Sequence, residues 1–200
     1  IIVEDDGVGF DPEHISDKSI GIPNISKRLK MMEGVIFRIE SQIGKGTRAV
    51  KPGAFEKGRL QAIRIDASNE FLATDGTCIY TSDGAELIAM ACRMEEYEVV
   101  PGCCRIGEKA FAGATGLERI HLPEGVEFIG SLAFSYTGIA SFECPQTLTE
   151  IGPKAFLRCP KLLEVHLNDG LYVIGEEAFS GSALKTLRIP ASVEVLGRSV

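Results

Sequence analysis

The residues most suited to chemistry lie near the start of the chain, where an apolar run leads into "EDDGVGF" at residues 4–10. Asp5, Gly7 and Gly9 make up the pattern D-x-G-x-G. A carboxylate accepts hydrogen bonds from an exocyclic amine, and glycines let the backbone come close to a ligand. The pattern therefore favours nucleotide binding. The alternative is purely structural, with the aspartates capping a turn that the glycines shape.

The segments that would position these residues form a short α+β unit. After the turn, Ile25, Leu29 and Met32 recur at helical spacing. "VIFRIES" at 35–41 alternates as a strand does, and "IGKGTRAV" at 43–50 is a glycine-rich turn leading into another strand. The expected order is strand, turn, helix and hairpin.

Three motifs in this order resemble the second half of a GHKL-type ATP-binding domain, most closely that of sensor histidine kinases. They are D-x-G-x-G-F, G-I-x-N-x-x-x-R-L and G-K-G-T, and they cover residues 1–50 only. The resemblance implies that the aspartate hydrogen-bonds the adenine amino group and that residues 19–21 belong to a lid turn near the phosphates. The nucleotide-contacting residues that it implies are Asp5, Gly7, Gly9, Gly21, Asn24 and Thr47.

The chain also departs from that family. The family's ATP site needs a preceding helix whose Asn holds Mg²⁺ and phosphate, and this sequence opens on Ile1 without it. Ser19 stands where the family commonly has Gly, and His14 lacks the helical context of a phosphoacceptor. We therefore expect a piece of a longer protein that is not catalytic as given, with ATP and Mg²⁺ used only by a complete parent. The alternative is a fragment of a sensor histidine kinase, an ATP-dependent phosphotransfer enzyme, that carries an appended repeat domain.

A repeat occupies most of the remaining sequence. It combines an Ala-Phe pair with an Ile-Gly pair four residues earlier, and successive Ile-Gly pairs are 22 or 23 residues apart. The Ala-Phe pairs begin at Ala54, Ala110, Ala133, Ala155 and Ala178, and the Ile-Gly pairs at Ile106, Ile129, Ile151 and Ile174. Each unit predicts two short strands, a sharp corner at the glycine, and a helical turn that points Ala-Phe inward. Because one unit cannot bury its own apolar face, the units must stack into a solenoid.

Stretches such as "LERIHLPEGVEFIGSLAF" at 117–134 resemble BspA-like leucine-rich repeats over about residues 53–200. The segment 66–99 interrupts the repeat and holds two Asp-Gly turns, which predict a small β-meander insertion. The resemblance implies a curved, right-handed solenoid that binds proteins, often on bacterial cell surfaces. The predicted fold class is mixed α/β, with a β-rich leucine-rich-repeat solenoid of 22–23-residue coils over 51–200, preceded by a partial α+β GHKL-type sandwich over 1–50.

One side chain in each repeat strand must point outward, between two inward apolar residues. These residues are Arg64, His121, Glu143, His166 and Arg188. The last four are 22, 23 and 22 residues apart, so they should form one column with neighbouring strands about 4.8 Å apart. We expect this column to contact a protein partner, although a solvated ladder of mixed charge is the simpler alternative. A metal site built on the two histidines is the weakest of the three interpretations.

The composition of the chain narrows the classes of protein to which it can belong. With 44% hydrophobic and 24% charged residues, the chain is typical of a soluble globular protein, and its apolar runs are too short to span a membrane. Residues 53–200 carry 13 Lys/Arg against 20 Asp/Glu, which argues against nucleic-acid binding. Six cysteines without C-x-x-C spacing favour free, buried thiols over disulfides or zinc. These thiols and the ATP-site motifs predict a cytoplasmic location, with the cell surface as the alternative.

Overall fold

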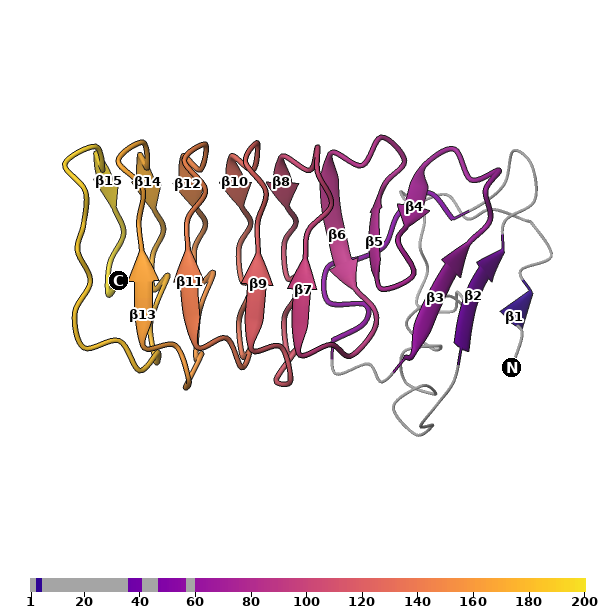
Figure 1. Ribbon diagram of the computed structural model, residues 1–200, viewed down its shortest axis with the longest axis horizontal. Helices are drawn as coiled ribbons and strands as arrows, with labels where there is room; N and C mark the ends of the chain where they lie inside the picture. Colours follow the sequence, from indigo (N-terminus) through magenta and orange to yellow (C-terminus); the bar gives the residue numbers. More distant parts are fainter. Residues whose placement is uncertain (1–2, 5–35, 41–46, 57–59) are drawn as a thin grey trace.

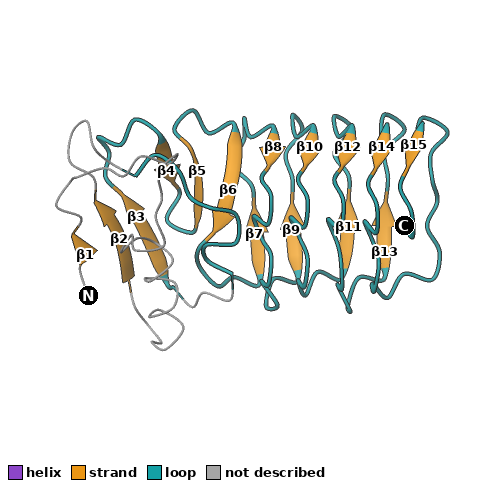
Figure 2. Cartoon of the chain, turned by 180° about the vertical axis from the view of Figure 1, so that it is seen from behind, coloured by secondary structure: helices purple, strands orange, loops and turns teal. Residues whose placement is uncertain are grey.

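The structure is a computed structural model of the 200-residue chain, and it describes residues 3–4, 36–40, 47–56 and 60–200. These residues form β-strands and turns, and none of them lies in a helix (Figures 1 and 2). A membrane-spanning helix is likewise not found in the part of the chain that is described. The predicted α component, a helix near residues 24–34, falls outside the described residues.

The strands are short and follow one another in a regular series. They are β1 (Val3–Glu4), β2 (Ile36–Glu40), β3 (Ala62–Ile65), β4 (Leu72–Thr74), β5 (Cys78–Thr81), β6 (Glu86–Met90), β7 (Glu96–Glu98), β8 (Arg105–Ile106), β9 (Arg119–His121), β10 (Phe128–Ile129), β11 (Ser141–Glu143), β12 (Glu150–Ile151), β13 (Glu164–His166), β14 (Val173–Ile174) and β15 (Val195–Leu196). From β7 to β14 they alternate between two sides of a solenoid, which confirms the predicted coil (Figure 1).

The Ile-Gly strands form one ladder along the solenoid. The strand order β15-β14-β12-β10-β8-β6 is parallel throughout, and each strand pairs with its equivalent one coil away. Ile129, for example, stands opposite Ile106 on one side and Ile151 on the other. Equivalent residues therefore stack directly, so the repeat period sets the register.

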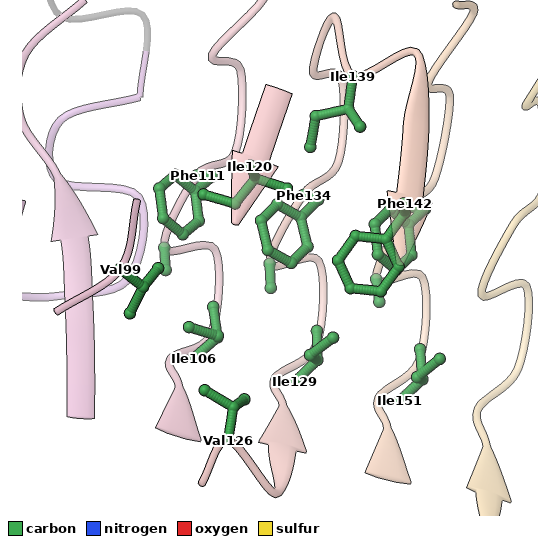
Figure 3. Close-up of a cluster of buried hydrophobic side chains, with 14 of the residues drawn as sticks. Val99, Ile106, Phe111, Ile120, Val126, Ile129, Phe134, Ile139, Phe142 and Ile151 are labelled. Carbon is green, nitrogen blue, oxygen red and sulfur yellow. The ribbon is translucent and has the colours of Figure 1, made fainter. Parts of the chain in front are cut away.

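A stack of phenylalanine rings runs through the interior (Figure 3). Phe111, Phe134, Phe156 and Phe179 lie ring over ring, with centroids 5.0, 5.0 and 5.3 Å apart and interplanar angles of 8–13°. The isoleucines of the Ile-Gly pairs form a second buried row beside them. The Ala-Phe and Ile-Gly spacing thus encodes a continuous core, as expected.

The glycine of each Ile-Gly pair has a different role from the predicted one. The backbone at Gly130 and Gly152 is not left-handed. Instead, a Cβ at Gly152 would lie 2.8 Å from the carbonyl oxygen of Ile129, because the adjacent coil passes so close. The left-handed residue comes two positions later, where positive φ recurs in every coil at Lys109, Leu132, Lys154, Glu177 and Ser199. The corner is therefore a turn with a left-handed residue, and the predicted helical turn is wrong.

The first strands pair differently from the predicted hairpin. β2 lies between β1 and β3 and is parallel to both, with Val3 opposite Ile39 and Ile36 opposite Ala62. Residues 47–50 contain no strand, although "IGKGTRAV" predicts one. The side chain of Val50 is buried in a small cluster with Phe55, Leu60 and Ile63. Val50 therefore packs against the first coil although residues 47–50 do not form the predicted strand.

An antiparallel segment separates β3 from the regular coils. β4 and β5 are joined through Asp75-Gly76, and β5 and β6 through Asp83-Gly84. Both glycines have positive φ, and each aspartate accepts backbone N–H bonds from the residues after its turn. β6 then joins the parallel ladder at β8.

Candidate partner-binding face

Four strands on one side of the solenoid present their outer side chains to solvent. In β7, β9, β11 and β13 the middle residue is buried and the two flanking residues are exposed. Alternation of this kind follows from the strand's two-residue period. We call the exposed set the outer strand face, and it consists of Glu96, Glu98, Arg119, His121, Ser141, Glu143, Glu164 and His166.

In the first half of this face, ion pairs link the side chains of β7 to those of β9. β7 and β9 pair in parallel, with Glu96 opposite Arg119 and Glu98 opposite His121. Arg119 Nη2 lies 2.9 Å from Glu96 Oε2, and His121 Nε2 lies 3.2 Å from Glu96 Oε1. The hydrogen bonds from Arg119 and His121 hold the pKa of the Glu96 carboxyl below its usual range. This glutamate is therefore an anchored negative charge.

In the second half of the face, the ion pair lies within one strand. β11 and β13 pair in parallel, with Glu143 opposite His166. His166 Nε2 lies 2.9 Å from Glu164 Oε1, and both side chains are more than 60% exposed. At the margin of the outer strand face, Lys161 Nζ lies 2.7 Å from Glu118 Oε1 and lowers the pKa of that carboxyl. The ion pairs are all at the surface, so they orient side chains more than they stabilise the fold.

The structure places most of the predicted partner-binding residues on this face. His121, Glu143 and His166 lie on it, and all three are exposed. Arg188 is exposed but follows in a segment without strand structure. Arg64 is exposed in β3, whose neighbour is β2, so it lies in a different sheet.

Sequence reasoning missed the two glutamates of β7. Glu98 stands 23 residues before His121, so the same spacing would have found it. It was overlooked because residues 66–99 break the Ile-Gly pattern, and β7 lies at the end of that segment. With both glutamates included, the face carries four Glu against one Arg, a formal charge of −3 with neutral histidines.

The predicted nucleotide-contacting residues cannot be assembled into a site here. Asp5, Gly7, Gly9, Gly21 and Asn24 lie outside the described residues. Thr47 is half-buried, and its backbone carbonyl accepts a 3.2 Å hydrogen bond from Asn69 Nδ2.

The thiols and carboxylates of the described residues form no metal-binding group of three or more. All six cysteines are unpaired, and five are buried while Cys104 is exposed. Burial raises the pKa of Cys92 to about 11 and that of Cys144 to about 12, so these thiols stay protonated near neutral pH. This arrangement agrees with the prediction of free, buried cysteines.

Comparison with known families decides the identity of the repeat. The BspA type leucine-rich repeat region matches residues 89–200 in six copies. The chain belongs to the BspA-type leucine-rich repeat family. The match begins inside β6, at the strand where the parallel ladder of this BspA-type chain also begins.

Solved structures support the same fold. A leucine-rich repeat protein from Eubacterium ventriosum is 19% identical, with a TM-score of 0.51 over 80% of this chain and 56% of that protein. The pneumococcal vaccine antigen PcpA is 18% identical, with a TM-score of 0.53 over 83% of this chain and 51% of the antigen. The BspA-type chain thus spans little more than half the length of either protein. No curated protein matches it significantly.

Proposed function

We propose that this BspA-type chain is a protein-binding module whose outer strand face binds a partner through a basic surface. The observation that carries the proposal is the charge of that face, −3 from four glutamates and one arginine on adjacent strands. Complementary charge mainly selects partners and speeds their association. Leucine-rich repeats of this kind fit the role because stacked coils form an extended, repetitive surface.

Two features of the face favour a macromolecule over a small ligand. Its eight residues are spread along four strands on one side of the solenoid. In addition, the ion-paired side chains remain 47–64% exposed, so their charges are available to a partner. A small ion could satisfy only one of these pairs, whereas a protein surface could contact the whole row.

The test compares two doubly substituted chains of equal charge. Glu98→Lys with Glu143→Lys reverses two charges on the outer strand face, where neither glutamate has an ion pair among the described residues. Glu108→Lys with Glu176→Lys makes the same change at exposed positions in the turns. Proteins captured from a lysate by the wild-type chain should be lost with the first variant and kept with the second. Equal loss from both variants would show that overall charge, not the face, determines capture.

We also propose, as a second and separate function, that residues 1–50 derive from an ATP-binding domain. The support is the order of the three sequence motifs, D-x-G-x-G-F, G-I-x-N-x-x-x-R-L and G-K-G-T. ATP and Mg²⁺ would then be cofactors of a complete parent kinase. A cytoplasmic location depends on this proposal, because ATP is available there.

Calorimetry with ATP, with and without Mg²⁺, tests the second function on this chain. Binding with a Kd on the order of 1 mM or tighter that is lost on Asp5→Asn would support an adenine site. Thr47→Ala provides a further comparison at the other end of the implied site. No detectable heat with the wild-type chain would count against nucleotide binding and against the location inferred from it.

A further inference from the structure

The repeat breaks at β6, where a strand replaces the usual turn. The backbone N–H of Met90 donates to the carbonyl of Ala110 at 2.7 Å, just as Phe111 donates to Ala133. Met90 therefore occupies the phenylalanine position of its coil. However, β6 continues as a strand through Met90, and no residue from 85 to 101 has a left-handed φ.

This replacement ends the phenylalanine stack. Phe111 stacks on Phe134 with the rings at 8°, but the next position of the stack holds Met90, which has no ring. The ring of Tyr97 contacts Phe111 from a β-strand, as Phe142 contacts Phe156 in the regular coils. The next Ala-Phe turn belongs to the first coil, where Gly53 has positive φ and Phe55 is buried in a separate core cluster. β5 and β6 contribute residues to both core clusters, so the division between the two clusters lies at these strands.

A cavity of about 300 Å³ opens at the division, and we call it the break cavity. Its lining is partly apolar and partly polar, and Phe55, Met90 and Phe111 are among the apolar residues. The lining also includes Cys92, Arg93, Ala112 and Gly116. Its volume lies at the small end of the range for ligand pockets.

Two glycines at equivalent positions of successive coils show that the backbones are farther apart at the break. At Gly138 in a regular coil, a Cβ would collide with the backbone carbonyl of Thr115 in the preceding coil. At Gly116, one coil earlier, a Cβ would meet only the side chain of Arg93, whose Nε would be 3.4 Å away. The preceding backbone is therefore farther away at Gly116, and a flexible arginine side chain lies in its place.

Arg93 supplies the one charge at this cavity among the described lining residues. Its guanidinium has no hydrogen bond or ion pair within the described part of the chain, although the side chain lies against the rim. Cys92, the other ionisable residue, donates a hydrogen bond to the carbonyl of Gly76, and burial keeps its thiol protonated. An unpaired guanidinium beside a partly apolar cavity suits a carboxylate, which it can bind through two parallel hydrogen bonds.

We propose that the break cavity binds an apolar carboxylate of about the size of one aromatic amino acid. The apolar group lies among Phe55, Met90 and Phe111, and the carboxylate pairs with Arg93. The ligand is either a free small molecule or the C-terminal residue of a peptide. This site is separate from the outer strand face and does not depend on its function.

The test uses N-acetylphenylalanine as the probe and NMR titration of the full chain as the readout. We expect a Kd on the order of 1 mM, with shifts confined to the lining residues. N-acetylphenylalanine amide, which lacks the carboxylate, should bind at least about tenfold more weakly. A pentapeptide ending in phenylalanine distinguishes the two sources, because tighter binding than the free probe indicates a peptide end and weaker binding indicates a small molecule.

Three variants then locate the site. Arg93→Gln should reduce affinity about tenfold, while the matched control Arg105→Gln, on an arginine outside the cavity, should leave it unchanged. Ala112→Leu should abolish binding by filling the cavity, and the fold should tolerate it because the equivalent residue two coils later is Leu157. The proposal is overturned if the probe does not bind, if the amide binds equally well, or if Ala112→Leu retains the thermal stability and the affinity of the wild type.

Discussion

The regular coils and the break differ in the backbone of the turn, and the difference shows what the repeat requires. From β8 to β14 a left-handed residue turns each coil so that its phenylalanine stacks on the next. In the coil of β6 an apolar residue, Met90, is present at the same position but the turn is not. An apolar residue at the right spacing is therefore not enough to continue the stack of phenylalanine rings. The turn is also needed, because it directs the side chain onto the ring of the next coil.

The largest expected effect contrasts a phenylalanine inside the stack with one beside the break. Phe134 is fully buried between two rings, so Phe134→Ala should lower the free energy of unfolding by about 3–5 kcal/mol. Phe55 already borders a cavity, and Phe55→Ala should cost clearly less. Urea unfolding followed by circular dichroism measures both. An equal loss at the two sites would mean that the stack adds nothing to ordinary burial.

The glycines provide a second contrast, of smaller size. Gly152→Ala should destabilise by about 1–3 kcal/mol, because its Cβ would lie 2.8 Å from the carbonyl of Ile129. Gly116→Ala should have little effect, since only the movable Arg93 side chain is near. Thermal denaturation of the two variants compares them. If Gly116→Ala is the more harmful, the coils approach each other closely at the break as well.

Alkaline pH should act on a group of buried residues near the break. The Tyr97 hydroxyl bonds to Tyr80, 2.5 Å away, and donates to the carboxylate of Asp75, and burial raises the pKa of both tyrosines and of Cys78. Unfolded tyrosines ionise near pH 10, so the unfolded state loses protons at a lower pH than the folded state does. Stability should therefore fall as pH rises above about 9.

The corresponding experiment follows the melting temperature from pH 8 to pH 11, a range around the ordinary pKa values of about 8.5 for cysteine and 10 for tyrosine. Tyr97→Phe removes one of the shifted groups, so it should make the decline shallower even if it lowers stability at neutral pH. A wild-type chain whose melting temperature does not change over this range would contradict the buried, neutral state of these groups.

The smallest effect concerns thiol reactivity. Cys104 is exposed, whereas the other five cysteines are buried. A thiol reagent at about pH 8 should therefore modify one cysteine rapidly in the folded chain and all six in urea. The variant Cys104→Ser should remove the rapid phase. Rapid reaction of Cys92, which lines the break cavity, would show that the cavity is more open than described.

Much of the regular solenoid could be predicted from the sequence, because equivalent residues of successive coils stack in register. The Ile-Gly and Ala-Phe spacing was enough to place the core and three residues of the outer strand face, His121, Glu143 and His166. The left-handed position could not be found in this way. Lysine, leucine, glutamate and serine occupy it from β8 onward, and among the described coils only the first has glycine there, at Gly53. A second left-handed position, four residues later, holds glycine at Gly113 and Gly181 but Tyr136 and Arg158 in the two coils between them.

The coil of β6 and β7 was harder to predict from the sequence, and the reason is physical. Leu87, which stands opposite Ile106, precedes it by 19 residues, so the 22–23-residue step does not extend to the coil of β6 and β7. Glu96 and Glu98 were missed for the same reason. The break cavity depends on the absence of a turn, and no single residue type in the sequence predicts that absence.

The most direct measurement of the central claim is site-specific photo-crosslinking. A photoreactive residue at Ser141, in the middle of the outer strand face, is compared with one at Tyr136, an exposed residue in the turn just before β11. If the face binds a protein, adducts of one defined mass should form from Ser141, weaken with salt, and disappear with the Glu98→Lys and Glu143→Lys substitutions. Adducts formed equally from Tyr136, or none from Ser141, would contradict the assignment of the outer strand face as the binding surface.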